Sequence, residues 1–257
     1  DIIVFNRSFN DFSNIAFRGN SYETLEAYAR KVETRVDTKT RVETRTIISS
    51  PDELAAATLE GFTVTEDMLG NYSQTTYGRT APSRSSEETP DGLYHLHFVP
   101  KKLTREVSAV LHIEGLNNIR SATCRLGGVA ESIFLATGKT SANTVTQEFT
   151  PSNPEFSPGS PFNGTLSCEF EIFGLNVIDN NNLHLDALLV DGKTEFEGDC
   201  TNVKITENDD GTGSITLILE ASTEKVPDVK PEGGAGSGFD VDVDGWGNEI
   251  NTDIPIN

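Results

Sequence analysis

The segment FDVDVDGWGNEI, residues 239–250, contains the most conspicuous set of potential metal ligands in this chain. Asp240, Asp242 and Asp244 occupy alternate positions and a glycine follows, as at the start of a calcium loop of the EF-hand type. The twelfth position of such a loop needs a bidentate glutamate, but Asn251 stands there. A β-strand that buries the residues between the aspartates explains the alternation better, so the three aspartates are weak candidates for metal ligands.

Two other patterns suggest binding sites and have simpler interpretations. His95 and His97 have the spacing of a pair of metal ligands on one strand face, but the sequence indicates no third ligand for a zinc site. The tripeptide GKT occurs at 138–140 and 192–194, yet neither copy has the glycine that a phosphate-binding loop places five residues before its GK glycine. We therefore expect no cofactor.

Catalytic signatures are also missing from the sequence. It contains no GxSxG nucleophile elbow and no Cys–His signature of a thiol enzyme. Glu169 and Glu171 could in principle flank a glycosidic bond, but glutamates on one strand face usually belong to a solvated surface. His112 and His184 each lie on the polar side of a predicted strand, with no evident partner. We therefore predict a protein that is not an enzyme.

Alternation of apolar and polar residues dominates after residue 100 and predicts an all-β fold built from strands with one face in a core. The clearest strands are 106–115, 165–173, 183–190 and 214–220. The dipeptide Asp191-Gly192 predicts a two-residue type I′ hairpin turn. NDDGTG, residues 208–213, predicts a second hairpin, and the proline-rich segment 151–164 predicts a long surface loop.

The first hundred residues are less regular. Segments 21–29 and 50–59 predict one or two short helices, and the second has the Ser-Pro-x-Glu pattern of a capping box. Between them, residues 30–46 alternate valine and threonine with charged residues, which predicts an exposed ribbon or an edge strand. A segment rich in serine, threonine, proline and glycine, 75–92, is the best candidate for a linker.

Length and composition limit the remaining possibilities. The chain has 257 residues, and we predict an N-terminal domain, 1–100, and a C-terminal domain, 101–257. The net charge of -20 would repel nucleic acid and anionic lipid, so neither is an expected partner. Cys124, Cys168 and Cys200 form no CxxC pair, so we expect mainly buried thiols, with one disulfide possible.

Several segments resemble the fimbrillin-like surface proteins of Bacteroidales, which include the type V pilus subunits and their lipoprotein relatives. The matching stretches are DIIVFN near the start, residues 103–138, TLSCEFEIFGL at 165–175, and a glycine-rich lead into FDVDVDGWGNEI. The resemblance implies two tandem transthyretin-like (Greek-key) β-sandwich domains. It also implies export as a lipoprotein and display at the outer membrane or in a pilus.

The resemblance further implies assembly by β-strand addition to other pilus subunits or surface proteins. Ile250, Ile254 and Ile256 put apolar residues at even positions near the end of the chain, so we expect them to act as a donor strand. Because the sequence opens directly in an apolar run, at Ile2, we expect further strands upstream and contact with a membrane only through a lipid anchor outside this sequence. The alternative is a surface lipoprotein module that binds glycans or host proteins.

Overall fold

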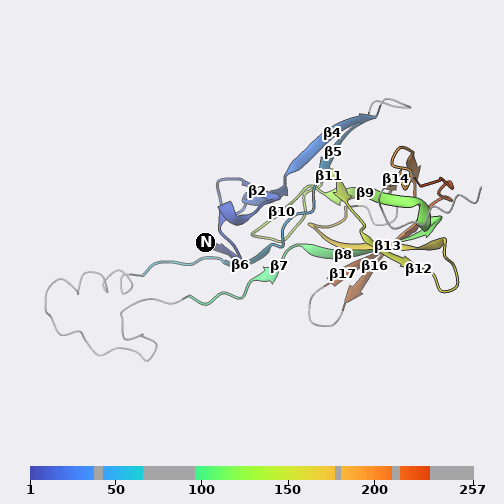
Figure 1. Cartoon of the computed structure of the whole chain (residues 1–257). Helices are drawn as coiled ribbons and strands as arrows, with labels where there is room; N and C mark the ends of the chain where they lie inside the picture. Colours follow the sequence, from blue (N-terminus) through green and yellow to red (C-terminus); the bar gives the residue numbers. More distant parts are fainter. Residues whose placement is uncertain (38–42, 66–95, 177–180, 210–214, 232–257) are drawn as a thin grey trace, which may run out of the picture.

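A computed structural model shows how the chain folds (Figure 1). It describes residues 1–37, 43–65, 96–176, 181–209 and 215–231. Within these ranges the regular structure consists of β-strands and short 3₁₀ turns, η1 (Phe9–Asp11) and η3 (Leu116–Asn118). The all-β prediction is confirmed. None of the described segments is a helix long and apolar enough to cross a membrane.

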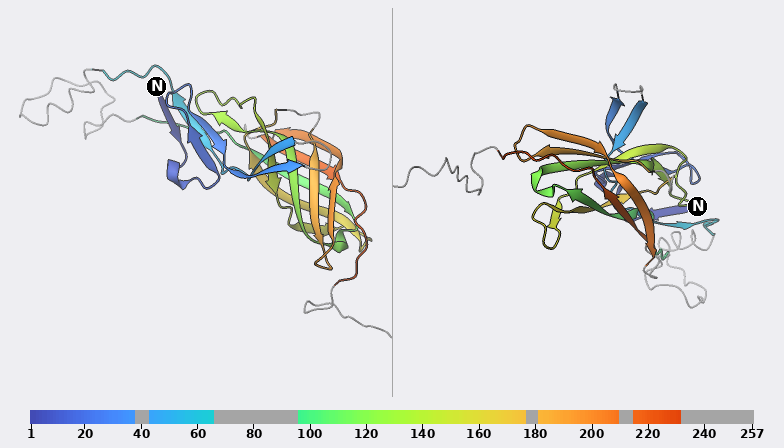
Figure 2. Two further views of the ribbon diagram at one scale, coloured as in Figure 1. Left: turned by 90° about the horizontal axis from the view of Figure 1, so that it is seen from above. Right: turned by 90° about the vertical axis from the view of Figure 1, so that its right-hand side faces the viewer.

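The larger sheet has six strands in the order β15-β14-β9-β11-β5-β4. Its strands are β15 (Glu195–Asp199), β14 (Leu183–Leu189), β9 (Ile119–Ala130), β11 (Thr144–Phe149), β5 (Glu43–Ile48) and β4 (Lys31–Asp37). Neighbours are antiparallel except for β11 and β5, which run parallel. The hairpin of β4 and β5 projects from the body, and β4 lies at the sheet edge, as the alternation in residues 30–46 predicts (Figure 2).

The second sheet has five strands in the order β12-β13-β8-β17-β16. Its strands are β12 (Asn153–Phe156), β13 (Asn163–Ile172), β8 (Arg105–Glu114), β17 (Ile215–Ser222) and β16 (Thr201–Asp209). The two sheets lie face to face as a β-sandwich (Figure 2). Phe149 of β11 stacks on Phe170 of β13 with ring centroids 4.3 Å apart, and these rings connect the two layers.

Two sheets of three strands lie at one end of the sandwich (Figures 1 and 2). One contains β1 (Ile2–Phe5), β6 (Ala55–Leu59) and β7 (Lys101–Lys102), and the other β10 (Ser132–Phe134), β3 (Glu26–Ala29) and β2 (Ile15–Arg18). Strands from before and after residue 100 pair in three of the four sheets. A division into domains at residue 100 stays a prediction, and it would separate strands that pair with each other.

The predicted alternation explains the core of the sandwich. One face of β8 is buried, and so is one face of β14. The buried residues are Val107, Ala109, Leu111 and Ile113 of β8 and Leu183, Leu185, Ala187 and Leu189 of β14. Burial of this kind contributes roughly 1.5–3 kcal/mol for each large aliphatic side chain. The three cysteines carry free thiols, with Cys124 buried and the other two half-buried.

The short helices predicted at 21–29 and 50–59 are wrong. Residues 26–29 and 55–59 form β3 and β6 instead. The hydroxyl of Ser50, expected to cap a helix, accepts a hydrogen bond from the backbone N–H of Glu171 at 2.9 Å and donates one to its carbonyl oxygen at 3.1 Å. The Asp52 carboxylate accepts a hydrogen bond from the backbone N–H of Asn14. Tertiary contacts therefore use the groups that would have started the helix.

Two predictions about turns also need correction. Segment 151–164 is a loop only in part, since Pro154 lies in the edge strand β12, where a missing N–H is tolerated. The hairpin at Asp191-Gly192 exists, but it is not a type I′ turn, because only the glycine has a positive φ, at 70°. The Asp191 side chain accepts hydrogen bonds from the hydroxyl and N–H of Thr194 and from the N–H of Lys193, and these hydrogen bonds lower its pKa.

Candidate functional site

Seven candidate residues from the sequence analysis lie outside the described part of the structure. This holds for the metal candidates Asp240, Asp242 and Asp244, for the donor candidates Ile250, Ile254 and Ile256, and for His95. These assignments stay predictions.

The structure gives no support for chemistry at the glutamate pair of β13 or at the two GKT segments. The Glu171 carboxylate accepts a hydrogen bond of 2.6 Å from Lys102, while Glu169 is exposed on the same strand. Both GKT segments start at a glycine in the left-handed region, with φ of 66° at Gly138 and 70° at Gly192. Both segments are therefore turns, as expected for sequences that do not form a phosphate-binding loop.

The open edge of β1 is the surface that best suits a binding role. β1 pairs with β6 on one side, and no described strand pairs with its other side. All four of its residues, Ile2 to Phe5, are apolar and half-buried. An edge of this kind offers backbone N–H and C=O groups to another chain, together with apolar side chains that gain from being covered.

The hydrogen-bond pattern shows which backbone groups face outward. The N–H of Asn6 donates to the carbonyl of Ala55 at 3.1 Å, and the register places Phe5 opposite Ala56. Bonded and non-bonded pairs alternate along antiparallel strands, so Ile2 and Val4 direct their backbone groups toward β6. The N–H and C=O groups of Ile3 and Phe5 therefore point to the open edge.

A cluster of phenylalanine side chains packs around Phe5 of β1. Phe5 stacks on Phe17 at 5.3 Å between ring centroids and meets Phe9 edge-on at 4.8 Å. Phe12 is 3% exposed, whereas Phe9 is 51% exposed. Such ring pairs contribute about 0.5–1.5 kcal/mol beyond the area that they bury. The edge strand therefore packs on a phenylalanine cluster that is still partly exposed to solvent.

Most other sheet edges have features that discourage pairing. The edge strand β12 contains Pro154, the edge strand β15 is rich in exposed acidic residues, and the edge strand β16 has exposed residues of both charges. At β2, the outward carbonyl of Ile15 is occupied by the Arg30 side chain at 3.1 Å. The edge of β1 differs from these edges in being apolar, uncharged and free of proline.

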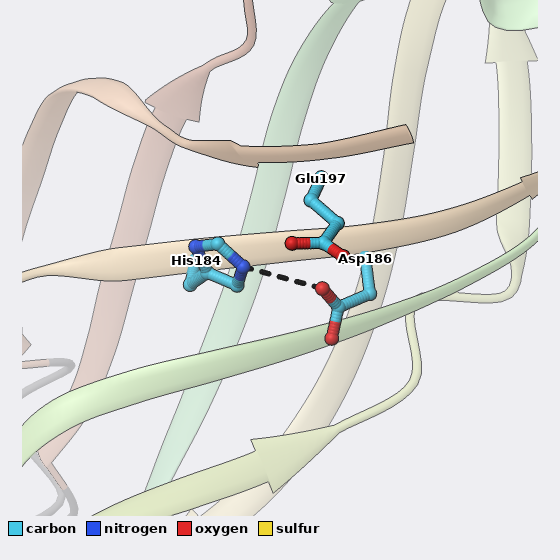
Figure 3. Close-up of side chains that lie close together, drawn as sticks. All are labelled: His184, Asp186 and Glu197. Carbon is cyan, nitrogen blue, oxygen red and sulfur yellow. Dashed lines mark ion pairs between the residues drawn. The ribbon is translucent and has the colours of Figure 1, made fainter. Parts of the chain in front are cut away.

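A second group of side chains was missed by the sequence analysis. His184 and Asp186 point out from β14, and Glu197 points to them from the neighbouring strand β15 (Figure 3). His184 alone gave no signal, but the alternation in HLD and EFE puts all three residues on the polar faces of adjacent strands. The register of the hairpin that joins the strands was the signal that could have found the group.

Comparisons with known proteins define the family of this chain. One solved structure, described as a "putative adhesin" from Bacteroides ovatus ATCC 8483, is similar with a TM-score of 0.46 and 16% sequence identity. The match covers 77% of this chain and 63% of that chain, so this chain spans less than two thirds of that protein's length. No curated protein matches the chain. The profile of the family described as "Domain of unknown function (DUF5119)" matches residues 1–150, more than half of the sequence, and the chain therefore belongs to the DUF5119 family.

Proposed function

We propose that this protein is a non-enzymatic cell-surface protein, structural or adhesive, that joins partner subunits by β-strand addition. β1 accepts the incoming strand. The observation that carries the proposal is the open, apolar edge of β1 above its phenylalanine cluster. Main-chain hydrogen bonds to an added strand supply affinity, and alternate side chains supply register.

The donor in this proposal is the C-terminal segment of another copy, with Ile250, Ile254 and Ile256 as its apolar face. Their even spacing puts the three side chains on one side of an extended strand. Pro255 fits this assignment, because an added strand pairs along one edge and tolerates a residue without an N–H on the other.

The sequence resemblance adds a setting to this proposal. It favours two tandem transthyretin-like sandwiches and display at the outer membrane or in a pilus through a lipid anchor outside this sequence. The cell surface is where adhesion or assembly by strand addition would take place.

The test is binding of a labelled peptide with the sequence of residues 247–257 to the full chain, measured by fluorescence anisotropy. The peptide should bind, and a peptide with Ile254→Asp should bind at least tenfold more weakly, because a charge would replace a buried apolar group. Ile3→Pro removes an outward N–H while leaving the pairing with β6 intact, so it should weaken binding. Ile3→Val keeps both the N–H and a branched apolar side chain, and it is the matched control.

Equal binding of the two peptides would refute the donor assignment. Equal binding by the Ile3→Pro and Ile3→Val proteins, with both folded by circular dichroism, would refute β1 as the acceptor. If Ile3→Pro fails to fold, the peptide pair still tests the donor assignment, because Ile254→Asp changes the peptide and leaves the protein unchanged.

A further inference from the structure

We propose that His184, Asp186 and Glu197 bind a zinc ion on the outer face of the six-stranded sheet. The alternation of β14 places the first two side chains outward, because Leu183, Leu185 and Ala187 are buried on the inner face. These residues belong neither to the calcium-loop pattern at 240–251 nor to the pair of His95 and His97.

The ligand atoms lie close enough to share one ion after small rotations of the side chains. One ligand atom from each of the three residues lies within 4.8 Å of the others. The Nε2 atom of His184 is 3.2 Å from Oδ1 of Asp186, and Glu197 approaches from the next strand (Figure 3). Ligands about 2.0–2.2 Å from a central ion are separated by distances of this order, so small rotamer changes would complete the site.

Neighbouring residues hold two of the ligands in orientation. The Nδ1 atom of His184 is 2.9 Å from Oδ1 of Asp199, the carboxylate–histidine arrangement that fixes the ring of a metal ligand. Arg125 contacts the other oxygen of Asp186, Oδ2, and also bonds Glu148 at 3.0 Å. Asp186 therefore has one oxygen held by the sheet and the other directed toward the imidazole.

The three side chains bring ligand atoms together from two adjacent strands. The Nε2 atom of His184 lies 3.2 Å from Oδ1 of Asp186, and Glu197 of β15 completes the group. An imidazole nitrogen beside two carboxylates is a set of ligands that a divalent transition-metal ion binds.

The ligand set favours zinc over calcium. One imidazole nitrogen and two carboxylates suit Zn²⁺, whereas Ca²⁺ takes six to eight oxygen ligands. Three protein ligands leave a fourth position open. A surface hollow of about 240 Å³ lies beside the site, and Ser121, Thr123 and Glu195 line it together with Asp186 and Glu197. The hollow gives water or a side chain of a partner access to the carboxylates of Asp186 and Glu197.

The test is isothermal titration calorimetry of the full chain with zinc chloride near pH 7, together with thermal unfolding in zinc and in EDTA. The protein should bind one zinc ion at this site and unfold at a higher temperature when zinc is present. His184→Gln should weaken binding at least tenfold and abolish the thermal shift. Asp199→Asn, which loosens the ring without removing a ligand, should weaken binding about tenfold.

His112→Gln is the matched control, because His112 is an exposed histidine on β8 of the other sheet. It should leave zinc binding unchanged. Unchanged binding in the His184→Gln protein would overturn the proposal, and so would an absence of heat when the original protein is titrated with zinc. Asp186→Asn supplies a second test if His184→Gln fails to fold.

Discussion

Replacing Phe170 by alanine should destabilise the protein strongly, because this ring joins the two layers of the sandwich. Phe170 is 7% exposed, and it stacks on Phe149 of the facing sheet at 4.3 Å between centroids and 17° between ring planes. Removing a buried phenylalanine side chain costs about 3–5 kcal/mol, since the transfer energy is lost and a cavity remains. In a chain of this size, each kcal/mol lowers the midpoint of thermal unfolding by about 2–4 °C, so we expect a decrease of roughly 6–20 °C.

Urea and thermal unfolding followed by circular dichroism measure this loss. Phe156→Ala is the matched control, because Phe156 is 48% exposed on the edge strand β12 and should cost less than about 1 kcal/mol. A double-mutant cycle with Phe149→Leu and Phe170→Leu isolates the ring–ring interaction, for which we expect about 0.5–1.5 kcal/mol of coupling. A loss below 1 kcal/mol in Phe170→Ala, or no coupling in the cycle, would refute the packing of these rings between the sheets.

Three further predictions concern other parts of the described structure. Gly164→Ala should destabilise the protein, with a lower urea midpoint, because a Cβ at this position would lie 2.1 Å from a backbone carbonyl oxygen of β12. Burial raises the pKa of Cys168 and of Cys200 to about 11, so both thiols should react slowly with Ellman's reagent at pH 8 until urea unfolds the chain; rapid reaction in the folded state would contradict this. The hydrogen bond from Arg18 lowers the pKa of Glu26 in the folded protein. The ionised Glu26 therefore stabilises the fold at a pH above its unfolded pKa of about 4.3, and this stabilisation is lost as the pH falls through the lower folded pKa. Glu26→Gln should flatten the acid side of the stability–pH curve.

The sequence predicts strands well where one face is buried against a single core. Segments 106–115 and 183–190 have an apolar residue at every second position, and the structure buries the predicted face of each. The segment 50–59 misled the prediction because its local signals for a helix are complete. Its Ser50 hydroxyl is bonded to Glu171, more than a hundred positions away, and a contact of that range leaves no trace in the local pattern.

The open edge of β1 also depends on a long-range contact that the local sequence pattern does not contain. The apolar run from Ile2 to Phe5 is readily predicted as a strand. Its exposure along one side depends on the order β1-β6-β7, and β6 belongs to the very segment that reads as a helix. Without that pairing, the sequence cannot show which backbone groups of Ile3 and Phe5 remain available. The open edge on which the proposed acceptor role rests therefore had to come from the structure.

The histidine cluster is a case in which the sequence contained more information than its motifs. In a hairpin, paired residues lie at equal distances from the centre of the turn, here between Asp191 and Gly192. This places His184 opposite Asp199 and Asp186 opposite Glu197, as the structure has them. The predicted turn was of the wrong type, but a loop of two residues and a loop of four residues with the same centre give the same register. The contribution of Arg125 could not be found in this way, because β9 reaches β14 through long-range pairing. The ligands of the proposed zinc site thus follow from local hairpin geometry, while the residue that orients Asp186 follows only from the tertiary fold.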